Sequence, residues 1–287
     1  MTFSPGLGWQ PDLPDSRDRK PEDEAVWDQL AQVSRRRKRT SESLREHFRE
    51  EIADQRELPA SPAFACGSLA EYFRNRVDSD STGLSKLFLY HTASRLSGDH
   101  YATSLELRTT LKAMTRFGLP HEKFWPDTEP NRNAVPSDPF LYGFAKDYAS
   151  IQFVRLDSPD GNGIDTLDRV KGFLAAGFPS VFGFTVPATV TRDGRIPWRR
   201  RFEVMGGQAV VAVGYDDHRY GKKKGALEFL NTWGADWGEN GYGWLPYRFV
   251  EKRLALDFWT LLQPRWLDSD EFRRPDISCL AGNGRTR

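Results

Sequence analysis

The segment GGQAVVAVGYDD, residues 206–217, decides how this chain folds. Two glycines and an amide, Gln208, precede an unbroken apolar run that leads to two aspartates. A short run rich in β-branched residues and bounded by glycine and aspartate is typical of a buried strand. We therefore expect a strand over residues 209–215, with Gln208 just before it.

The sequence on either side of this segment divides the chain into a helical half and a β half. Four more short apolar runs predict strands, and one helix is expected among them, over residues 163–176. Upstream, the spacing of apolar residues predicts helices over 61–77, 83–97 and 104–117, and then a proline-rich loop to residue 148. The pattern predicts an α+β fold with a cleft between the halves. The four additional strands are expected over residues 151–156, 180–186, 226–231 and 258–262.

Chain organisation follows from shifts in composition. We expect an extended N-terminal strap and a charged, helix-compatible segment over residues 1–54, a helical subdomain over 55–148 and a β subdomain over 149–266. Residues 267–287 are polar and predict a flexible tail. The basic run at 35–39 is interpreted as a solvated helix face, with a nucleic-acid or partner patch as the alternative.

Charge and cysteine content limit the class of protein. The 287 residues include 41 basic and 40 acidic side chains, so the net charge of +1 gives no field that would steer the protein to nucleic acid or to a membrane. Cys66 and Cys279 are far apart, which argues against a disulfide framework. With no apolar run long enough for a span or a signal peptide, we expect a cytoplasmic protein. We also expect no metal and no cofactor.

Three blocks resemble the active-site motifs of papain-like cysteine peptidases in their bacterial form. DQ at 54–55 with SPAFA at 61–65 resembles the first block, residues 206–217 resemble GGHAVLAVGYDD, and residues 230–242 resemble NSWGxxWGxxGY. GWQPDLPD at 8–15 and DFWT at 257–260 extend the resemblance from about Gly8 to Gln263. The resemblance implies a two-subdomain fold with a β-barrel-like right half and a cleft that binds an extended peptide.

The chain differs from this family at the two positions that carry catalysis. Ser61 stands where the resemblance places the nucleophilic Cys, and Gln208 stands where it places the general-base His. Asn231, which would orient the His, is retained, as are Trp233, which would shield it, and Gln55, which would help to bind an oxyanion. Gly206, Gly207 and Ser104 are further cleft positions. Ser104 aligns with a glycine whose bare backbone pairs with peptide.

The two replacements remove acid–base chemistry. A neutral hydroxyl is a weak nucleophile, and a carboxamide neither accepts its proton nor delivers one to a leaving amine. Losing a nucleophile or base in serine peptidases costs on the order of 10⁶-fold in turnover. His218 should lie at the far end of the strand from Gln208, and the other histidines are expected in surface or capping roles. Cys66, five residues beyond Ser61, is expected to be a core thiol turned away from the cleft.

A structural interpretation accounts for each of these residues without chemistry. Ser61 is then a helix N-cap, Gln208 a strand amide hydrogen-bonded to Asn231, and Gln55 a loop anchor. Residues 198–202, with the sequence WRRRF, are either a solvated loop or a cleft rim that attracts acidic peptide. A laboratory exchange of Cys for Ser would explain Ser61 and leave Gln208 unexplained.

These observations predict an inactive papain-like homologue that binds a protein or an extended peptide as a scaffold or regulator. The alternative is an enzyme, a peptidase or acyl transferase that uses Ser61 with a base not recognised in the sequence. The two hypotheses differ in whether a group that can take a proton contacts the Ser61 oxygen.

Overall fold

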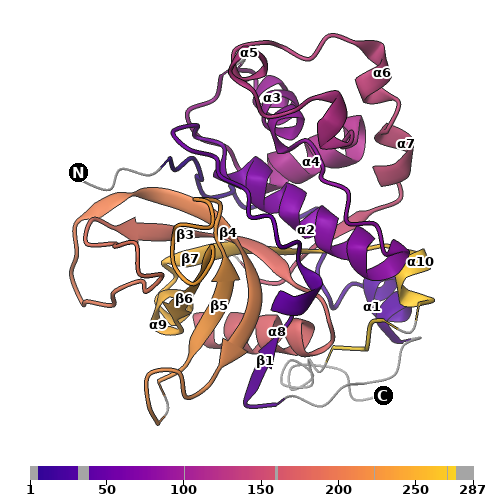
Figure 1. Ribbon diagram of the computed structural model, residues 1–287. Coiled ribbons are helices and arrows are strands. Elements are labelled where there is room, and N and C mark those ends of the chain that lie inside the picture. Colours follow the sequence, from indigo (N-terminus) through magenta and orange to yellow (C-terminus); the bar gives the residue numbers. More distant parts are fainter. Residues whose placement is uncertain are drawn as a thin grey trace.

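An antiparallel sheet and a set of helices lie side by side in the computed structural model, with helices α2 to α7 in the upper half of Figure 1 and the sheet in the lower half. The structure describes residues 6–31, 39–99, 101–158, 161–222, 224–269 and 271–275. Residues 35–38 of the basic run at 35–39 and most of the expected tail, 276–287, lie outside these ranges. No helix among the described residues is both long enough and apolar enough to span a membrane.

The sheet has seven antiparallel strands in the order β2-β7-β3-β4-β5-β6, with β1 paired to β4. The five predicted strands are present, and β4 is longer than predicted at its start. The expected β-barrel-like closure is wrong. Within the described residues β2 and β6 form the two ends of the sheet and do not pair with each other, so the sheet is open. The strands are β1 (Ser41–Ser43), β2 (Gln152–Arg155), β3 (Ser180–Pro187), β4 (Val204–Asp216), β5 (Ala226–Leu230), β6 (Tyr242–Pro246) and β7 (Ala255–Leu262).

Local signals delimit the long helices. In α2 (Ser61–Asp78) a proline occupies the first turn, where its missing amide hydrogen is not needed. Ser85 caps α3 (Lys86–Leu96), accepting from the Phe88 amide at 3.1 Å. α4 (Leu107–Phe117) ends at a glycine, and Asn162 caps α8 (Gly163–Ala175). These four helices were predicted to within three residues of their observed bounds.

Two segments differ from expectation. Residues 120–148 contain four short helical turns rather than loop alone, η2 (Glu122–Phe124), α5 (Glu129–Arg132), α6 (Pro139–Tyr142) and α7 (Ala145–Tyr148). Residues 40–56 are charged and helix-compatible, yet they form β1 and η1 (Arg45–His47): β1 pairs with β4, whereas a short helix that packs on nothing is only marginally stable in water. The remaining helices are α1 (Glu24–Ala31), α9 (Arg248–Glu251) and α10 (Pro264–Leu267).

The core lies between α2 and the sheet. α2 packs against β4 and β3, and its first thirteen residues, 61–73, are all buried. Cys66 is one of them, with no exposed surface, and burial raises the pKa of its thiol well above the ordinary value. The thiol is therefore a core side chain rather than a reactive one.

The first described residues form the N-terminal strap, residues 6–18, which contains no helix. It runs along the junction of the helical half and the sheet, as the indigo trace in Figure 1 shows. Backbone hydrogen bonds link it to β4 at Gly207 and to the segment before α4 at Leu105. The strap therefore lies where the two halves meet.

Candidate active site at the junction of the two halves

Four side chains that the sequence singles out come together at the junction. Gln55 precedes α2, Ser61 is the first residue of α2, Gln208 lies in β4, and Asn231 follows β5. Each has at most 1% of its surface exposed. Hydrogen bonds join Gln208 to Gln55 and Asn231, and Ser61 is linked to this buried group through the Ala209 amide and the Leu7 carbonyl.

The Gln208 amide connects three parts of the chain. Its Nε2 lies 3.0 Å from Asn231 Oδ1, 2.9 Å from Thr232 Oγ1 and 3.2 Å from Gln55 Oε1. The Thr232 amide donates to Asn231 Oδ1 at 2.8 Å, which makes that oxygen an acceptor and fixes Gln208 as its donor. The hydrogen bond from Gln208 to Asn231 expected from the sequence is present.

The Ser61 hydroxyl has a backbone partner. Its oxygen accepts from the Ala209 amide at 3.1 Å, and no imidazole, ammonium or carboxylate is hydrogen-bonded to it within the described chain. The expected N-cap role is wrong, because Ala60 precedes the helix and Ser61 already has helical geometry. The site therefore holds an alcohol and carboxamides, with no group that titrates near neutral pH.

The strap binds the two donors that the sequence resemblance assigns to a substrate carbonyl. Gln55 Nε2 donates to the Leu7 carbonyl oxygen at 2.8 Å, and the Ser61 amide lies 3.5 Å from the same oxygen. Trp233 Nε1 donates to the Gly6 carbonyl at 2.7 Å. The donors expected to hold an oxyanion are thus already used by the chain itself.

Backbone pairing continues along the strap. The Gly8 and Trp9 amides both lie 3.1 Å from the Gly207 carbonyl oxygen, and the Leu105 amide donates to the Gly8 carbonyl at 2.7 Å. The Gln10 amide in turn donates to the Leu105 carbonyl at 3.1 Å. In this segment Leu105, next to Ser104, pairs with the backbone of the strap.

Ser104 and Gly206 contact strap side chains instead. The Ser104 hydroxyl donates to Gln10 Oε1 at 2.7 Å. A Cβ at Gly206 would meet Leu7 Cδ1 at 2.6 Å. Both predicted cleft positions therefore face the protein's own N-terminal segment.

Bare glycines make room for Trp9, which is only 7% exposed. A Cβ at Gly183 would lie 1.9 Å from the indole, and one at Gly207 would lie 2.3 Å from the Trp9 carbonyl oxygen. These distances are far below any van der Waals contact, so the two glycines and the indole fit only together. The groove is shaped around its own strap.

A buried charge cluster holds the C-terminal part of the strap. Arg108 donates to both Asp18 oxygens at 2.6 and 2.7 Å, and Arg155 donates to Asp257 at 2.6 Å. The Asp12 amide donates to the Asp257 carboxyl at 2.8 Å. Four aspartates and two arginines, all under 9% exposed, belong to this aspartate–arginine cluster: Asp12, Asp18, Asp157, Asp257, Arg108 and Arg155.

Acid exceeds base in this cluster, and that imbalance shifts its titration. Burial raises the pKa of Asp12 to about 6. Burial, together with repulsion from Asp12 and Asp157, raises the pKa of Asp257 to about 8. Two guanidinium groups cannot neutralise four ionised carboxylates, so part of the cluster keeps a proton near neutral pH.

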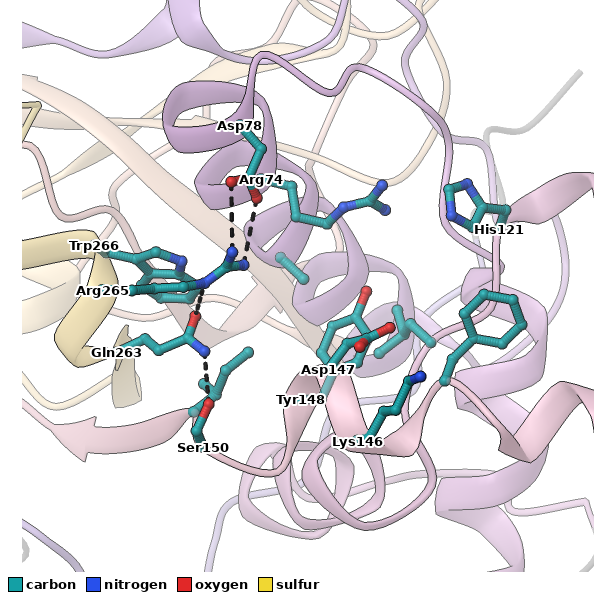
Figure 2. A pocket seen from close by; sticks show the side chains of 14 residues that line it. Arg74, Asp78, His121, Lys146, Asp147, Tyr148, Ser150, Gln263, Arg265 and Trp266 are labelled. Carbon is teal, nitrogen blue, oxygen red and sulfur yellow. Dashed lines mark hydrogen bonds and ion pairs between the residues drawn. The ribbon is translucent and has the colours of Figure 1, made fainter. Parts of the chain in front are cut away.

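A second cavity lies at the junction of α2, α7 and α10, seen in Figure 2, with a volume of about 370 Å³. Its polar groups bond mainly to one another: Arg265 pairs with Asp78 at 3.3 Å, and Gln263 donates to the Ser150 hydroxyl at 2.6 Å. We interpret this cavity as a structural junction. No group of three or more His, Cys, Asp or Glu placed to hold a metal occurs among the described residues.

Sequence reasoning missed the residues that occupy the site, Leu7 and Trp9, and the bridging Thr232. A signal was present, since a tryptophan follows a glycine in the opening segment and an isolated glycine interrupts the apolar run of β3. A glycine inside a strand often marks the close approach of another group.

Comparison with known proteins finds relatives, although no family model matches the chain. An uncharacterized peptidase C1-like protein of Acanthamoeba polyphaga mimivirus is 32% identical over 186 residues, which are 62% of this chain. The match spans 58% of that relative, less than two thirds of its length.

Solved structures show the same architecture. Xylellain, a cysteine protease from Xylella fastidiosa, is 28% identical with a TM-score of 0.73, over 90% of this chain and 96% of that one. Procathepsin B S9 from Trypanosoma congolense is 17% identical with a TM-score of 0.64, over 90% and 85% of the two chains, and shows the fold alone. The fold is papain-like.

Proposed function

We propose that this chain, a homologue of papain-like cysteine peptidases, is catalytically inactive. It acts instead as a scaffold or regulator that binds a protein or a peptide. The papain mechanism needs a thiolate beside an imidazolium. This chain offers an alcohol and a carboxamide at the corresponding positions, and neither exchanges a proton near neutral pH.

The observation that carries the proposal is the environment of Ser61. Its oxygen bonds to the Ala209 amide, its expected base is replaced by Gln208, and Gln208 is itself committed to Asn231 and Thr232. Without proton transfer, a hydrogen bond from Gln55 to the substrate oxyanion would by itself give a turnover far below that of an active peptidase.

The strap occupies one of the surfaces where a partner could bind. Leu7 and Trp9 occupy the groove between the halves, and the groove is lined by glycines that accept them. A partner that entered there would first have to displace buried backbone pairs. We therefore propose that partners bind on another face of the molecule.

Hydrolysis and covalent labelling test the proposal. Purified protein is incubated with a mixed peptide library and, separately, with a serine-directed acylating probe, and both are followed by mass spectrometry. We expect intact peptides and no added mass on Ser61. Cleavage that disappears in Ser61→Ala, or an adduct on Ser61, would instead support the alternative enzyme.

A rebuilt pair separates missing chemistry from a blocked groove. Ser61→Cys with Gln208→His restores the family pair, and Trp9→Ala loosens the strap, with circular dichroism to check folding. We expect a vinyl-sulfone probe to label the rebuilt protein, and to label it faster when Trp9→Ala is added. Trp9→Ala alone should stay unlabelled by the acylating probe if the missing base, rather than the strap, prevents reaction.

A further inference from the structure

A pocket of about 730 Å³ lies on the β half, between three loops. They are residues 189–198 after β3, the loop between β4 and β5, which contributes Tyr220, Lys224 and Gly225, and residues 246–251 around α9. None of the residues that line it belongs to the strap or to the group around Ser61. Its size is that of a site for a small ligand or a few peptide side chains.

The wall of this pocket is partly aromatic. Trp198 lies edge-on to Phe249 with ring centroids 5.4 Å apart, and Tyr247 is held by a 2.8 Å hydrogen bond from its hydroxyl to Asp217. Tyr220 remains 38% exposed at the rim. Tryptophan, tyrosine and arginine are the residue types that dominate binding energy at protein interfaces.

Two cationic side chains at the rim of this pocket have no intramolecular ion-pair or hydrogen-bond partner among the described residues. The ammonium of Lys224 and the guanidinium of Arg195 make no ion pair or hydrogen bond within the ranges that the structure describes, although Arg195 acts on Asp193 at longer range. The lining acids do have partners: Asp193 accepts from the Thr191 hydroxyl at 2.7 Å, and Glu251 pairs with Arg248 at 3.4 Å. A partner therefore meets two available cations.

We propose that this pocket is the docking site for an acidic peptide segment of a partner protein, with an apolar side chain seated against Trp198 and Tyr247 and carboxylates beside Arg195 and Lys224. The inference deepens the proposed binding function and rests on it. Residues 199–201, three exposed arginines in the loop that follows Trp198, extend the positive field toward an approaching acidic chain.

The mixture of charges favours peptide over nucleic acid. A phosphate backbone presents a negative charge at every nucleotide, and Asp193 and Glu251 in the pocket would oppose it. A peptide can place its carboxylates at the two cations and neutral groups near the acids. Trp198, the first residue of the basic loop at 198–202, lines this pocket.

Fluorescence anisotropy with labelled peptides tests the inference. The probes are short fluorescein-labelled peptides in which Asp and Glu flank one Leu or Trp, their Asn/Gln counterparts, and a single-stranded RNA oligonucleotide. We expect acidic peptides to bind, neutral counterparts to bind more weakly, and Arg195→Glu with Lys224→Glu to lower the affinity by about tenfold or more. Tyr220→Ala should weaken binding without reducing its salt dependence.

The control is a charge-matched pair elsewhere on the surface. Lys112→Glu with Arg116→Glu changes the net charge equally on the exposed face of α4 and should leave the affinity unchanged. Equal loss in both pairs, equal binding of neutral peptides, or binding of RNA alone would overturn the inference. Mass spectrometry of the bound peptides keeps the two proposals apart: no binding with intact peptide refutes only the docking site, whereas cleavage refutes the proposed inactivity.

Discussion

At the scale of single residues, burial decides what Gln208 contributes. Its Nε2 joins β4 to the loop after β5 and to the loop before α2 through three oxygen partners. The carboxamide NH₂ shares two N–H donors among these three oxygens, whereas a neutral imidazole carries only one. The carboxamide that removes the base therefore also cross-links the junction of the two halves.

Gly183→Ala tests how closely the groove is built around Trp9. The new Cβ would lie 1.9 Å from the indole, so Trp9 must move. We expect the free energy of unfolding to fall by about 1–3 kcal/mol, as for other overpacked cores. Urea denaturation followed by tryptophan fluorescence measures it.

Gly143→Ala is the matched control for that substitution. Gly143 ends α6 with a φ of −61°, which alanine adopts freely, and its nearest Cβ contact is 3.2 Å from the Phe140 carbonyl oxygen. We expect its stability to stay within about 0.5 kcal/mol of the wild type. An equal, small effect of both substitutions would mean that Trp9 is not held tightly against β3.

At the scale of elements, the strap behaves as part of the sheet-and-helix framework. Four of its backbone bonds bridge to Gly207 and Leu105, and Asp12 adds another to Asp257 in β7. Backbone amides in such positions exchange with solvent only when the surrounding unit opens. The strap should therefore open together with the core.

Hydrogen–deuterium exchange tests this coupling. We expect peptides covering residues 6–12 to take up deuterium as slowly as peptides from the first three turns of α2, with residues 219–222 in an exposed turn as the fast reference. A little denaturant should accelerate the two slow regions in parallel. Rapid exchange in 6–12 while α2 stays protected would show a strap that opens independently.

The sequence could predict the elements because their signals are local. The apolar runs of β3 and β4, the Pro62 helix start and the Gly118 helix end all lie within a few residues of the feature that they specify. Motif spacing also identified Gln55, Ser61, Gln208 and Asn231, which the structure brings together.

Contacts between segments that are distant in the sequence could not be predicted from local sequence patterns. The bonds from Trp9 to Gly207 and from Gln55 to Leu7 join residues remote in sequence, and no short pattern encodes which segment fills a groove. The strand β1 was missed because its three polar residues give little signal and its pairing with β4 stabilises it, whereas β6 was missed although its aromatic residues favour a strand.

At the scale of the whole molecule, the aspartate–arginine cluster ties the strap to both halves. Asp12 accepts from the Arg108 amide in α4 at 3.1 Å and from Trp259 Nε1 in β7 at 2.8 Å. Removing one charge from such a buried group leaves others unpaired, so its protonation should affect global stability.

That cluster makes a signed prediction for pH. Asp12 and Asp257 have folded pKa values of about 6 and about 8, above their ordinary 3.8. The native state therefore holds more protons than the unfolded chain, and the free energy of unfolding falls as the pH rises from the ordinary pKa through the folded values.

Asp257→Asn removes one titrating group, and asparagine tolerates the local φ of 59°. We expect it to flatten the decline by roughly 2–4 kcal/mol between about pH 5 and about pH 8. Denaturant unfolding at each pH, compared with wild type so that the histidines cancel, measures it. The exposed Asp147→Asn should keep the wild-type slope, and an equal slope in Asp257→Asn would contradict the prediction.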